Sequence, residues 1–424
     1  MSNDSQEPKK KKSTLRKWIK RLFFIFGGFI LLLILIGILV PIIFKKDIKA
    51  KIDEEIAKSV NAHVYFDIDK FGLSMFTNFP NITVSMEEFG VVGKDRFKGD
   101  TLASVKDFEV EVDVWSVITG SQIKVRGIFL DSPKIYAKVL KDGTPNWDIA
   151  KADTTKKEEV KPENKKEDTT QTNFNIGIKR WKIKNAQITY ADEATPMYAS
   201  IKNLTHKGSG NFTQAVFDLK TKTTVDKIDF GYENTNYVEN KSIDIDLTLN
   251  MDLEKNKFTF KKNSIKVNEF VFGFDGFVQM VGEDIKMDVK YAAKENEFKN
   301  ILSLVPGVYT EMEEFKKMKT QGKFAFDGFV KGTYSEKQKL YPAFNFNFKV
   351  SDALFQYPDL PTPVNNINID VTIDNKTSDL EKTLVNLKKF HMNLGKNPID
   401  AKARVEGLSN FKIDANVKAQ LNLA

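Results

Sequence analysis

The clearest structural signal in the sequence is residues 243–254, which read Ile-Asp-Ile-Asp-Leu-Thr-Leu-Asn-Met-Asp-Leu-Glu. Large apolar side chains occupy every odd position, and every even position is polar or acidic. Successive side chains of a β-strand point to opposite faces of its sheet, so all the apolar groups of this stretch would share one face. The stretch therefore predicts a strand of an antiparallel sheet with one apolar face and one solvated face.

The same alternation recurs through most of the chain after Ala62. Segments rich in Gly, Pro, Asn and Asp separate the alternating runs and predict turns. Together these features predict a mainly β fold: an elongated, curled antiparallel β-sheet groove with a few short helices. Further alternating runs lie at residues 108–114, 344–350, 367–373 and 411–424.

The N-terminal segment has a different composition. Residues 22–44 contain no charged side chain, and at about 1.5 Å per residue a helix of this length crosses a hydrocarbon core of about 30 Å. Residues 1–21 hold most of the net positive charge of the chain, which is +8 in total. The positive-inside rule then predicts a cytoplasmic basic tail at 1–21, a transmembrane helix at 22–44 and a body outside the cytoplasm. A cleaved signal peptide is the alternative, although the apolar run is longer than in such peptides.

Three segments interrupt the strand pattern. Residues 47–60 place four aliphatic side chains four residues apart, which predicts an amphipathic helix that covers the first strands. Residues 151–172 contain one large aliphatic residue and predict a disordered charged loop, with a domain linker as the alternative. Residues 297–318 have helical spacing broken by a Pro-Gly pair, and they predict a helical insertion of two short helices, or a flap over an apolar groove.

The sequence contains few residues in arrangements typical of catalytic or metal-binding sites. The chain has no cysteine, which excludes disulfides, thiolate nucleophiles and Cys-ligated metals. We interpret His63, His206 and His391 as surface or turn residues, and Asp244 and Asp246 as part of a solvated strand face rather than a glycosidase pair. The chain after residue 21 is nearly neutral and lacks the excess of basic residues that binds nucleic acid. We therefore expect no enzyme activity, no cofactor, no metal and no nucleic-acid partner.

The chain has 34 phenylalanines but only four tryptophans, and many of the phenyl rings stand at alternating positions. Periodicity does not separate core packing between two sheets from rings that line an open trough. A trough would need an apolar occupant, because a large exposed apolar surface is unstable in water, and acyl chains would fit it. The candidate lining residues are Phe66, Ile68, Ile82 and Val84 near the membrane, and then Phe258, Phe260, Phe270, Phe272, Phe324, Phe326, Phe344, Phe346 and Phe348.

The order of segments in the first 150 residues is distinctive. The basic tail, the membrane segment and the helix at 47–60 precede the strand-like stretches 71–86, 101–114 and 125–148. The last of these ends in Lys-Asp-Gly-Thr-Pro-Asn-Trp-Asp, which contains the Asp142-Gly143 turn and the Asn146-Trp147 pair. This order resembles the AsmA family of bacterial envelope proteins. Residues 173–424 resemble the family more loosely, through strand repeats.

The resemblance implies a periplasmic body that begins with an N-terminal region at 45–150 and continues as a β-rich groove at 173–424. It implies a single-pass anchor in the bacterial inner membrane and a relation to chorein-type bridge lipid transporters. It also implies phospholipids as partners, in transport between the inner and outer membranes and in outer-membrane biogenesis. It supplies no catalytic residues.

The alternating pattern continues to the end of the sequence, around Leu421. An open apolar edge strand is a pairing hazard, so we expect this C-terminal edge to bind an envelope protein partner, unless the chain is a short family member or a fragment. The leading hypothesis for function is passive lipid carriage. A non-enzymatic scaffold or assembly factor for outer-membrane proteins is the alternative, and a periplasmic hydrolase is a third possibility.

Overall fold

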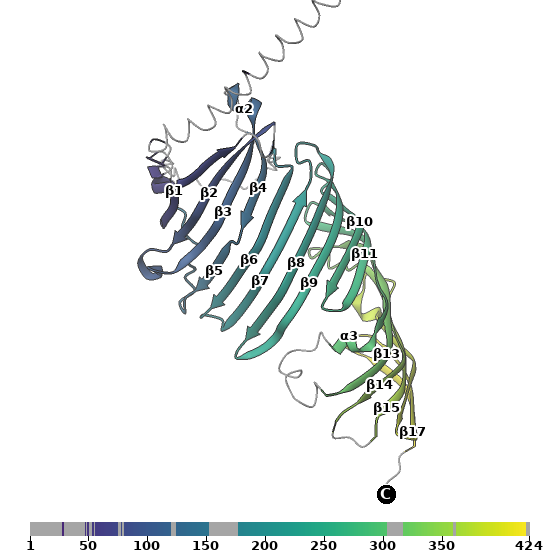
Figure 1. Cartoon of the computed structure of the whole chain (residues 1–424). Coiled ribbons are helices and arrows are strands. Elements are labelled where there is room, and N and C mark those ends of the chain that lie inside the picture. The colour runs from purple at the N-terminus through teal and green to yellow at the C-terminus, as the bar shows by residue number, and fades with distance from the viewer. Residues whose placement is uncertain are drawn as a thin grey trace, which may run out of the picture.

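The structure is a computed structural model of the chain. It describes residues 28, 47, 49, 50, 53, 54, 56–74, 78, 80–119, 124–151, 177–302, 317–358 and 362–420. The described residues form one sheet of eighteen strands, which curves and twists along its length (Figure 1). The prediction of a mainly β fold built on a curled sheet is confirmed.

The strands lie side by side in the order of the sequence, because most of them are joined to the next strand by a hairpin. Among the described strands, the first and the last form the two edges of the sheet. The strands are β1 (His63–Ser74), β2 (Asn81–Val92), β3 (Thr101–Asp113), β4 (Val125–Asp131), β5 (Lys134–Val139), β6 (Arg180–Asp192), β7 (Met197–Ser209), β8 (Val216–Tyr232), β9 (Thr235–Asp252), β10 (Lys257–Val267), β11 (Phe270–Val281), β12 (Asp284–Glu297), β13 (Lys319–Tyr334), β14 (Ala343–Gln356), β15 (Val364–Asn375), β16 (Leu384–Leu394), β17 (Asn397–Glu406) and β18 (Lys412–Ala419).

One part of the sheet differs from the antiparallel prediction. Strands β4 and β5 lie end to end, and both are antiparallel to β3 but parallel to β6. Parallel neighbours need a crossover that returns the chain to the starting end of the sheet. Residues 140–179 make this crossover, and the predicted loop at 151–172 falls within it. Apart from Lys151, that loop lies outside the described residues.

A line of bulges crosses the first half of the sheet. Asn185 in β6 and Asn203 in β7 have left-handed backbones, with φ of 54° and 55°, where the cross-strand register shifts. A bulge adds one residue to a strand, bends that strand and increases its twist. The Nδ2 atom of Asn203 donates a hydrogen bond to Asp226 Oδ2 at 3.1 Å, which ties β7 to β8 on this line. We call the line the first bulge seam; its residues are Glu88, Ser132, Asn185, Asn203, Asp226 and Asn240.

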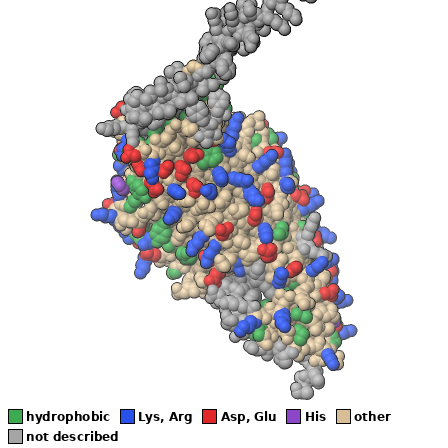
Figure 2. Space-filling view, viewed as in Figure 1, with side chains coloured by type: hydrophobic (Ala, Val, Ile, Leu, Met, Phe, Trp, Pro, Cys, Tyr) green, Lys and Arg blue, Asp and Glu red, His purple; other side chains and the backbone are tan. Residues whose placement is uncertain are grey.

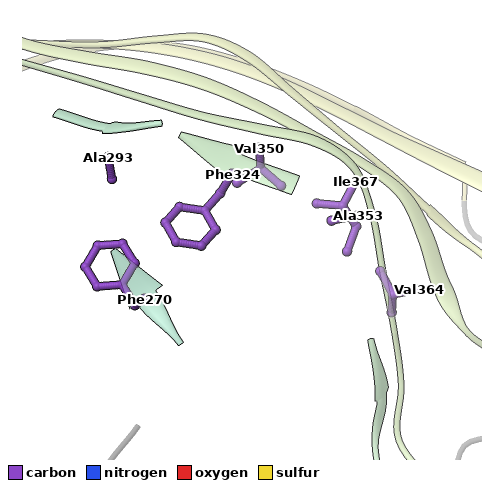
Figure 3. Packing of buried hydrophobic residues seen from close by; sticks show 7 residues of the cluster. All are labelled: Phe270, Ala293, Phe324, Val350, Ala353, Val364 and Ile367. Atoms are coloured by element: carbon purple, nitrogen blue, oxygen red, sulfur yellow. The ribbon is translucent and has the colours of Figure 1, made fainter. Parts of the chain in front are cut away.

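A second bulge seam crosses β12 to β16. Its left-handed residues are Gly322, Asp352 and Asn366, each beside a register shift. Gly322 lies so close to Ala353 that a Cβ atom at Gly322 would clash with the Ala353 backbone. The side chains on the inner side of this bend form the main buried cluster (Figure 3), which consists of Phe270, Ala293, Phe324, Val350, Ala353, Val364 and Ile367.

The sheet is a single curved layer over most of its length. Only fifteen hydrophobic residues of the described part are buried, and most of its other apolar side chains are partly exposed. In a sandwich, one whole face of each sheet would be covered by the other sheet. The bends at the two seams, rather than a second sheet, therefore account for the burial that is present.

The short helices match the predictions in part. The described residues between 47 and 60 are helical up to Ser59, and Lys49 Nζ lies 5.1 Å from the centroid of the Phe66 ring in β1. The helix therefore lies against the start of the sheet, as predicted. Helix α3 (Phe298–Leu302) begins the predicted insertion at 297–318, and residues 303–316 lie outside the described residues. Two 3-10 turns lie at Asp95–Phe97 and Leu380–Lys382.

Helix α2 (Val114–Ile118) was not predicted. The alternation predicts Val114 as a strand residue, but β3 ends at Asp113. The carboxylate of Asp113 accepts a hydrogen bond from the Ser116 backbone N–H at 3.0 Å, and this cap starts the helix.

The basic tail at 1–21 and the predicted transmembrane helix at 22–44 lie outside the described residues, apart from Gly28. In the part of the chain that the structure describes, no helix combines the length and the apolar character needed to cross a bilayer.

Candidate functional site: an apolar face across the sheet

All thirteen predicted lining residues lie on the same face of the sheet. Directly opposed residues in neighbouring strands share a face, and so do residues two apart in one strand. Phe348 opposes Phe326 across β14 and β13, and Phe260 opposes Gly276 across β10 and β11. At the other end, Val84 opposes Leu73 across β2 and β1.

The cross-strand register connects these positions into one surface. One row of opposed residues runs from β2 to β10 through Met86, Phe108, Leu130, Ile183, His206, Thr223, Ile245 and Ile265. A second row runs from β11 to β18 through Phe274, Tyr291, Gly328, Phe346, Ile373, Val385, Val405 and Ile413. The rows join because Ile265 opposes Phe272, two residues from Phe274. We call this surface the apolar face.

Eleven of the predicted lining residues are half-buried, but two are not. Phe270 and Phe324 are only 7% and 2% exposed. The small side chain of Ala293, on the strand between them, leaves room for the two rings to stack with centroids 5.6 Å apart. The structure therefore places Phe270 and Phe324 in the buried cluster rather than in an exposed lining, which corrects the prediction for these two residues.

The neighbouring rings continue this contact along the apolar face. Phe326 and Phe346 have centroids 5.8 Å apart, and Phe346 and Phe348 are 6.3 Å apart. Aromatic pairs at such distances are mutually stabilising. In β11 to β14 the chain's own rings thus pack against one another on the inner side of the bend.

An open part of the apolar face lies near the start of β4 and β6. Here a hollow of about 360 Å³ is walled almost entirely by apolar atoms. The indole of Trp181 and the ring of Phe212 lie against each other at 5.9 Å between centroids. This hollow was not predicted, because none of the candidate lining residues lies between β3 and β9; the alternation of Trp181 with Ile183 was the signal that could have found it. The hollow is lined by Ile128, Leu130, Ile178, Trp181, Lys182, Ile183 and Phe212.

His206 is a polar residue on the apolar face, not the surface or turn residue that was expected. Its Nδ1 atom lies 2.8 Å from the Thr223 hydroxyl, and its ring stacks near Trp181 with centroids 6.2 Å apart. Burial lowers the pKa of His206 below its ordinary value, which favours the neutral imidazole. The apolar face therefore carries a hydrogen-bonded polar pair rather than a charge at this point.

The opposite face of the sheet is polar. Figure 2 shows many Lys, Arg, Asp and Glu side chains over β2 to β9. Asp246 opposes Lys222 on this face, and Asp244 alternates with Ile245 and so lies there too. Glu111 is buried on this face and accepts hydrogen bonds from Arg180 Nη2 and Nε at 2.5 and 3.0 Å. Charged side chains thus gather on this face over β2 to β9, where Phe129 is an apolar exception opposite Glu109 and Lys182.

The Asn146-Trp147 pair has a structural role. The Asn146 side chain is buried, accepts a hydrogen bond from the Lys138 backbone N–H at 2.9 Å and donates one to the Tyr136 carbonyl at 2.8 Å. These bonds fold residues 140–147 back onto β5. The motif therefore closes a turn after β5, where the Trp147 ring lies 6.2 Å from the ring of Tyr190 in β6.

Comparison with protein-family models gives a match to the AsmA family over residues 15–273. No match was found among curated proteins or among solved structures. The matched range extends past the first 150 residues on which the resemblance was based, and it includes strands β1 to β10 with the hollow beside Trp181. More than half of the chain is matched. The chain belongs to the AsmA family.

Proposed function

We propose that the apolar face carries the acyl chains of phospholipids and that the protein takes part in lipid transport between the inner and outer membranes. The observation that supports this proposal best is the continuity of the face. It crosses every strand from β1 to β18 and has no second sheet over it in the described part of the chain. At about 4.8 Å per strand, the face is roughly 80 Å long measured along its curve.

The proposed mechanism is passive. Each methylene group of an acyl chain that leaves water gains about 0.8 kcal/mol, so the face holds acyl chains without specific polar contacts. Head groups stay in water at the rim. Because nearly equivalent apolar positions follow one another across the strands, a lipid can move along the face without a large barrier. Gradients or partner proteins then set the direction.

The proposal includes a membrane anchor and a periplasmic body. Residues 22–44 span the inner membrane, with residues 1–21 in the cytoplasm. The absence of cysteine makes this orientation easy to test, since a single Lys349→Cys substitution provides a unique label on the exposed outer face. Labelling of intact spheroplasts by a membrane-impermeant maleimide is expected; labelling only after lysis would contradict the orientation.

Lipid carriage is tested by placing charge on the apolar face. Replacing Phe344, Phe346 and Phe348 with Glu should abolish the phospholipid that co-purifies with the full chain, measured by native mass spectrometry. The matched control is Lys331→Glu with Lys349→Glu, which adds acid to the outer face of β13 and β14, where both lysines are exposed. A triple variant that folds, as judged by circular dichroism, and still carries lipid would refute the proposal. A variant that only aggregates would assign these rings to the core.

A second candidate function is a scaffold or assembly factor that binds an envelope protein at β18. One observation favours it: Ile413 and Val417 in β18 are 60% and 66% exposed. A photo-crosslinker at Val417 tests this candidate. Capture of a single protein, from a chain that carries no lipid, would favour the scaffold over the carrier.

A further inference from the structure

An exposed tryptophan lies in α2, directly after the end of β3, and is not part of the rows that form the apolar face. Trp115 in α2 is 68% exposed, the highest value among the large hydrophobic residues of the described part. Asn81 at the start of β2 opposes Asp113, the residue before α2. We call the side of the sheet where these strand ends lie the α2 edge, as distinct from the edge strands β1 and β18. An exposed indole costs free energy in water, but it is favoured at a membrane surface, where its ring meets acyl chains and its N–H meets water.

Polar contacts hold α2 in a fixed position. The Asp113 carboxylate accepts hydrogen bonds from the Ser116 backbone N–H and from Arg126 Nη2 at 2.8 Å. The Arg126 contact lowers the pKa of Asp113 and keeps it ionised. The buried Ser116 hydroxyl donates to the Asp113 carbonyl at 2.7 Å and accepts from the Lys124 backbone N–H at 3.1 Å. Both arms of the β3–β4 connection are therefore tied together, and Trp115 projects from a rigid support.

The helix at 47–60 is directed toward the same edge. Val60 forms a bridge with Ala150, and β1 begins beside it at His63, which opposes Val92 at the edge opposite α2. Lys49 nevertheless reaches the ring of Phe66, three residues along β1 toward the α2 edge. Eleven residues of helix span about 16 Å, so a helix that ran away from the sheet would place Lys49 out of reach. The helix therefore runs back along β1, and its N-terminal end faces the α2 edge.

The open hollow lies at this edge as well. Trp181 follows Arg180, the first residue of β6, and Arg180 pairs with Gly127 near the start of β4. Phe212 lies in the connection from β7 to β8, next to Trp181. The exposed side chains of Lys124 and Lys179 also lie at this edge, where they suit lipid phosphates.

We propose that Trp115 and α2 insert into the interfacial region of the bilayer that holds helix 22–44, and thereby set the hollow beside Trp181 at the membrane surface as the entry point for acyl chains. This inference rests on the proposed function, because it needs the membrane anchor that precedes residue 47. The occupant is a lipid surface rather than a protein, since the N-terminal end of the helix at 47–60 faces this edge and the proposed membrane segment at 22–44 comes just before it in the sequence.

The four tryptophans of the chain allow a direct test with an internal control. The first variant keeps only Trp115, and Trp18, Trp147 and Trp181 are replaced by Phe. The control keeps only Trp147, which is 45% exposed but follows β5 at the opposite edge. Both full-length variants are reconstituted in phosphatidylethanolamine and phosphatidylglycerol vesicles, with or without bromine on the acyl chains. Brominated lipid should quench most of the Trp115 emission and much less of the Trp147 emission.

The outcomes separate this inference from the proposed function. Unquenched Trp115 emission in a chain that floats with the vesicles would overturn the bilayer contact and leave the anchor intact. A chain that does not float with the vesicles would instead remove the proposed anchor, and the inference with it. In cells, a photo-crosslinker at position 115 should form lipid adducts; a protein adduct in their place would also overturn the inference.

Discussion

The two halves of the sheet, β1 to β9 and β10 to β18, share one apolar face but differ in how open it is. In the first half the face holds a hollow of about 360 Å³ whose wall is largely aliphatic, with Trp181 and Phe212 at its side. In the second half the rings of Phe270 and Phe324 fill the inner side of the bend. Phenyl rings at alternating positions therefore do not identify the open part of a trough. Most of them line the face as half-buried rings, but Phe270 and Phe324 pack into the buried cluster.

The bulge seams explain why both halves curve toward the apolar face. Each seam bends neighbouring strands at positions that lie side by side across the sheet, and side chains on the inside of the bend become buried. Ala186 lies directly after Asn185 in the first seam, and Ala353 directly after Asp352 in the second; both are buried. Around Ala353 the buried cluster includes the large rings of Phe270 and Phe324. A hollow of about 990 Å³ lies among β10 to β13, but polar side chains line it together with Phe272 and Tyr291.

The largest effect that would test this contrast is expected for Phe324→Ala. Removal of a fully buried ring should lower the free energy of unfolding by about 3–5 kcal/mol. Val84→Ala, on the half-buried part of the face in the first half, should cost only about 1 kcal/mol. Urea denaturation followed by circular dichroism measures both. Equal losses would show that the second half has no special core.

A smaller effect is expected at the second seam. Gly282→Ala in the β11–β12 turn meets no neighbouring atom but has a positive φ of 62°, so it should cost about 1 kcal/mol. Gly322→Ala has a positive φ as well and adds the clash with Ala353, for a further loss of about 1–3 kcal/mol. The same denaturation experiment compares them. Indistinguishable variants would mean that the close approach at Gly322 does not shape the bend.

The smallest effect concerns His206 in the first half. Because burial lowers its pKa, the unfolded chain binds a proton here more readily than the folded chain does. The contribution of His206 to the free energy of unfolding is therefore complete above the ordinary histidine pKa of about 6.5, and it falls as the pH drops below that value. The difference in free energy of unfolding between the wild type and His206→Gln, measured by urea denaturation, should shrink or reverse between about pH 7.5 and pH 5.5. A difference that stays constant would place His206 in a water-like environment.

Alternation was sufficient to predict which residues share a face, because a period of two is a property of every strand regardless of its partners. It could not predict burial. Phe324 and Phe326 have the same periodicity in β13 and both lie near Phe270, with ring centroids 5.6 and 5.9 Å away, but Phe324 is buried and Phe326 is only half-buried. That difference depends on a bend of the sheet and on strands far apart in the sequence.

The bulges and the crossover were also beyond the sequence pattern. Asn203 resembles any other polar residue on the outer face until the register shift around it is known. The parallel pairing of β4 and β6 depends on the course of a long connection, and strand periodicity carries no information on direction. The N-cap of α2 is Asp113, whose carboxylate accepts a hydrogen bond from the backbone N–H three residues later. The alternation at 108–114 predicts that the strand continues through Val114, so the cap was not recognised.

The most direct test of the central claim is a photo-crosslinking scan along the apolar face in cells with labelled phospholipid. The crosslinker is placed in turn at Met86, Ile183, Ile245 and Phe346, and at the outer-face position Lys349 as the control. The account predicts lipid adducts at every apolar position, strongest at Ile183 in the open hollow, and none at Lys349. Adducts that are absent from the apolar face, or equally strong at Lys349, would contradict it.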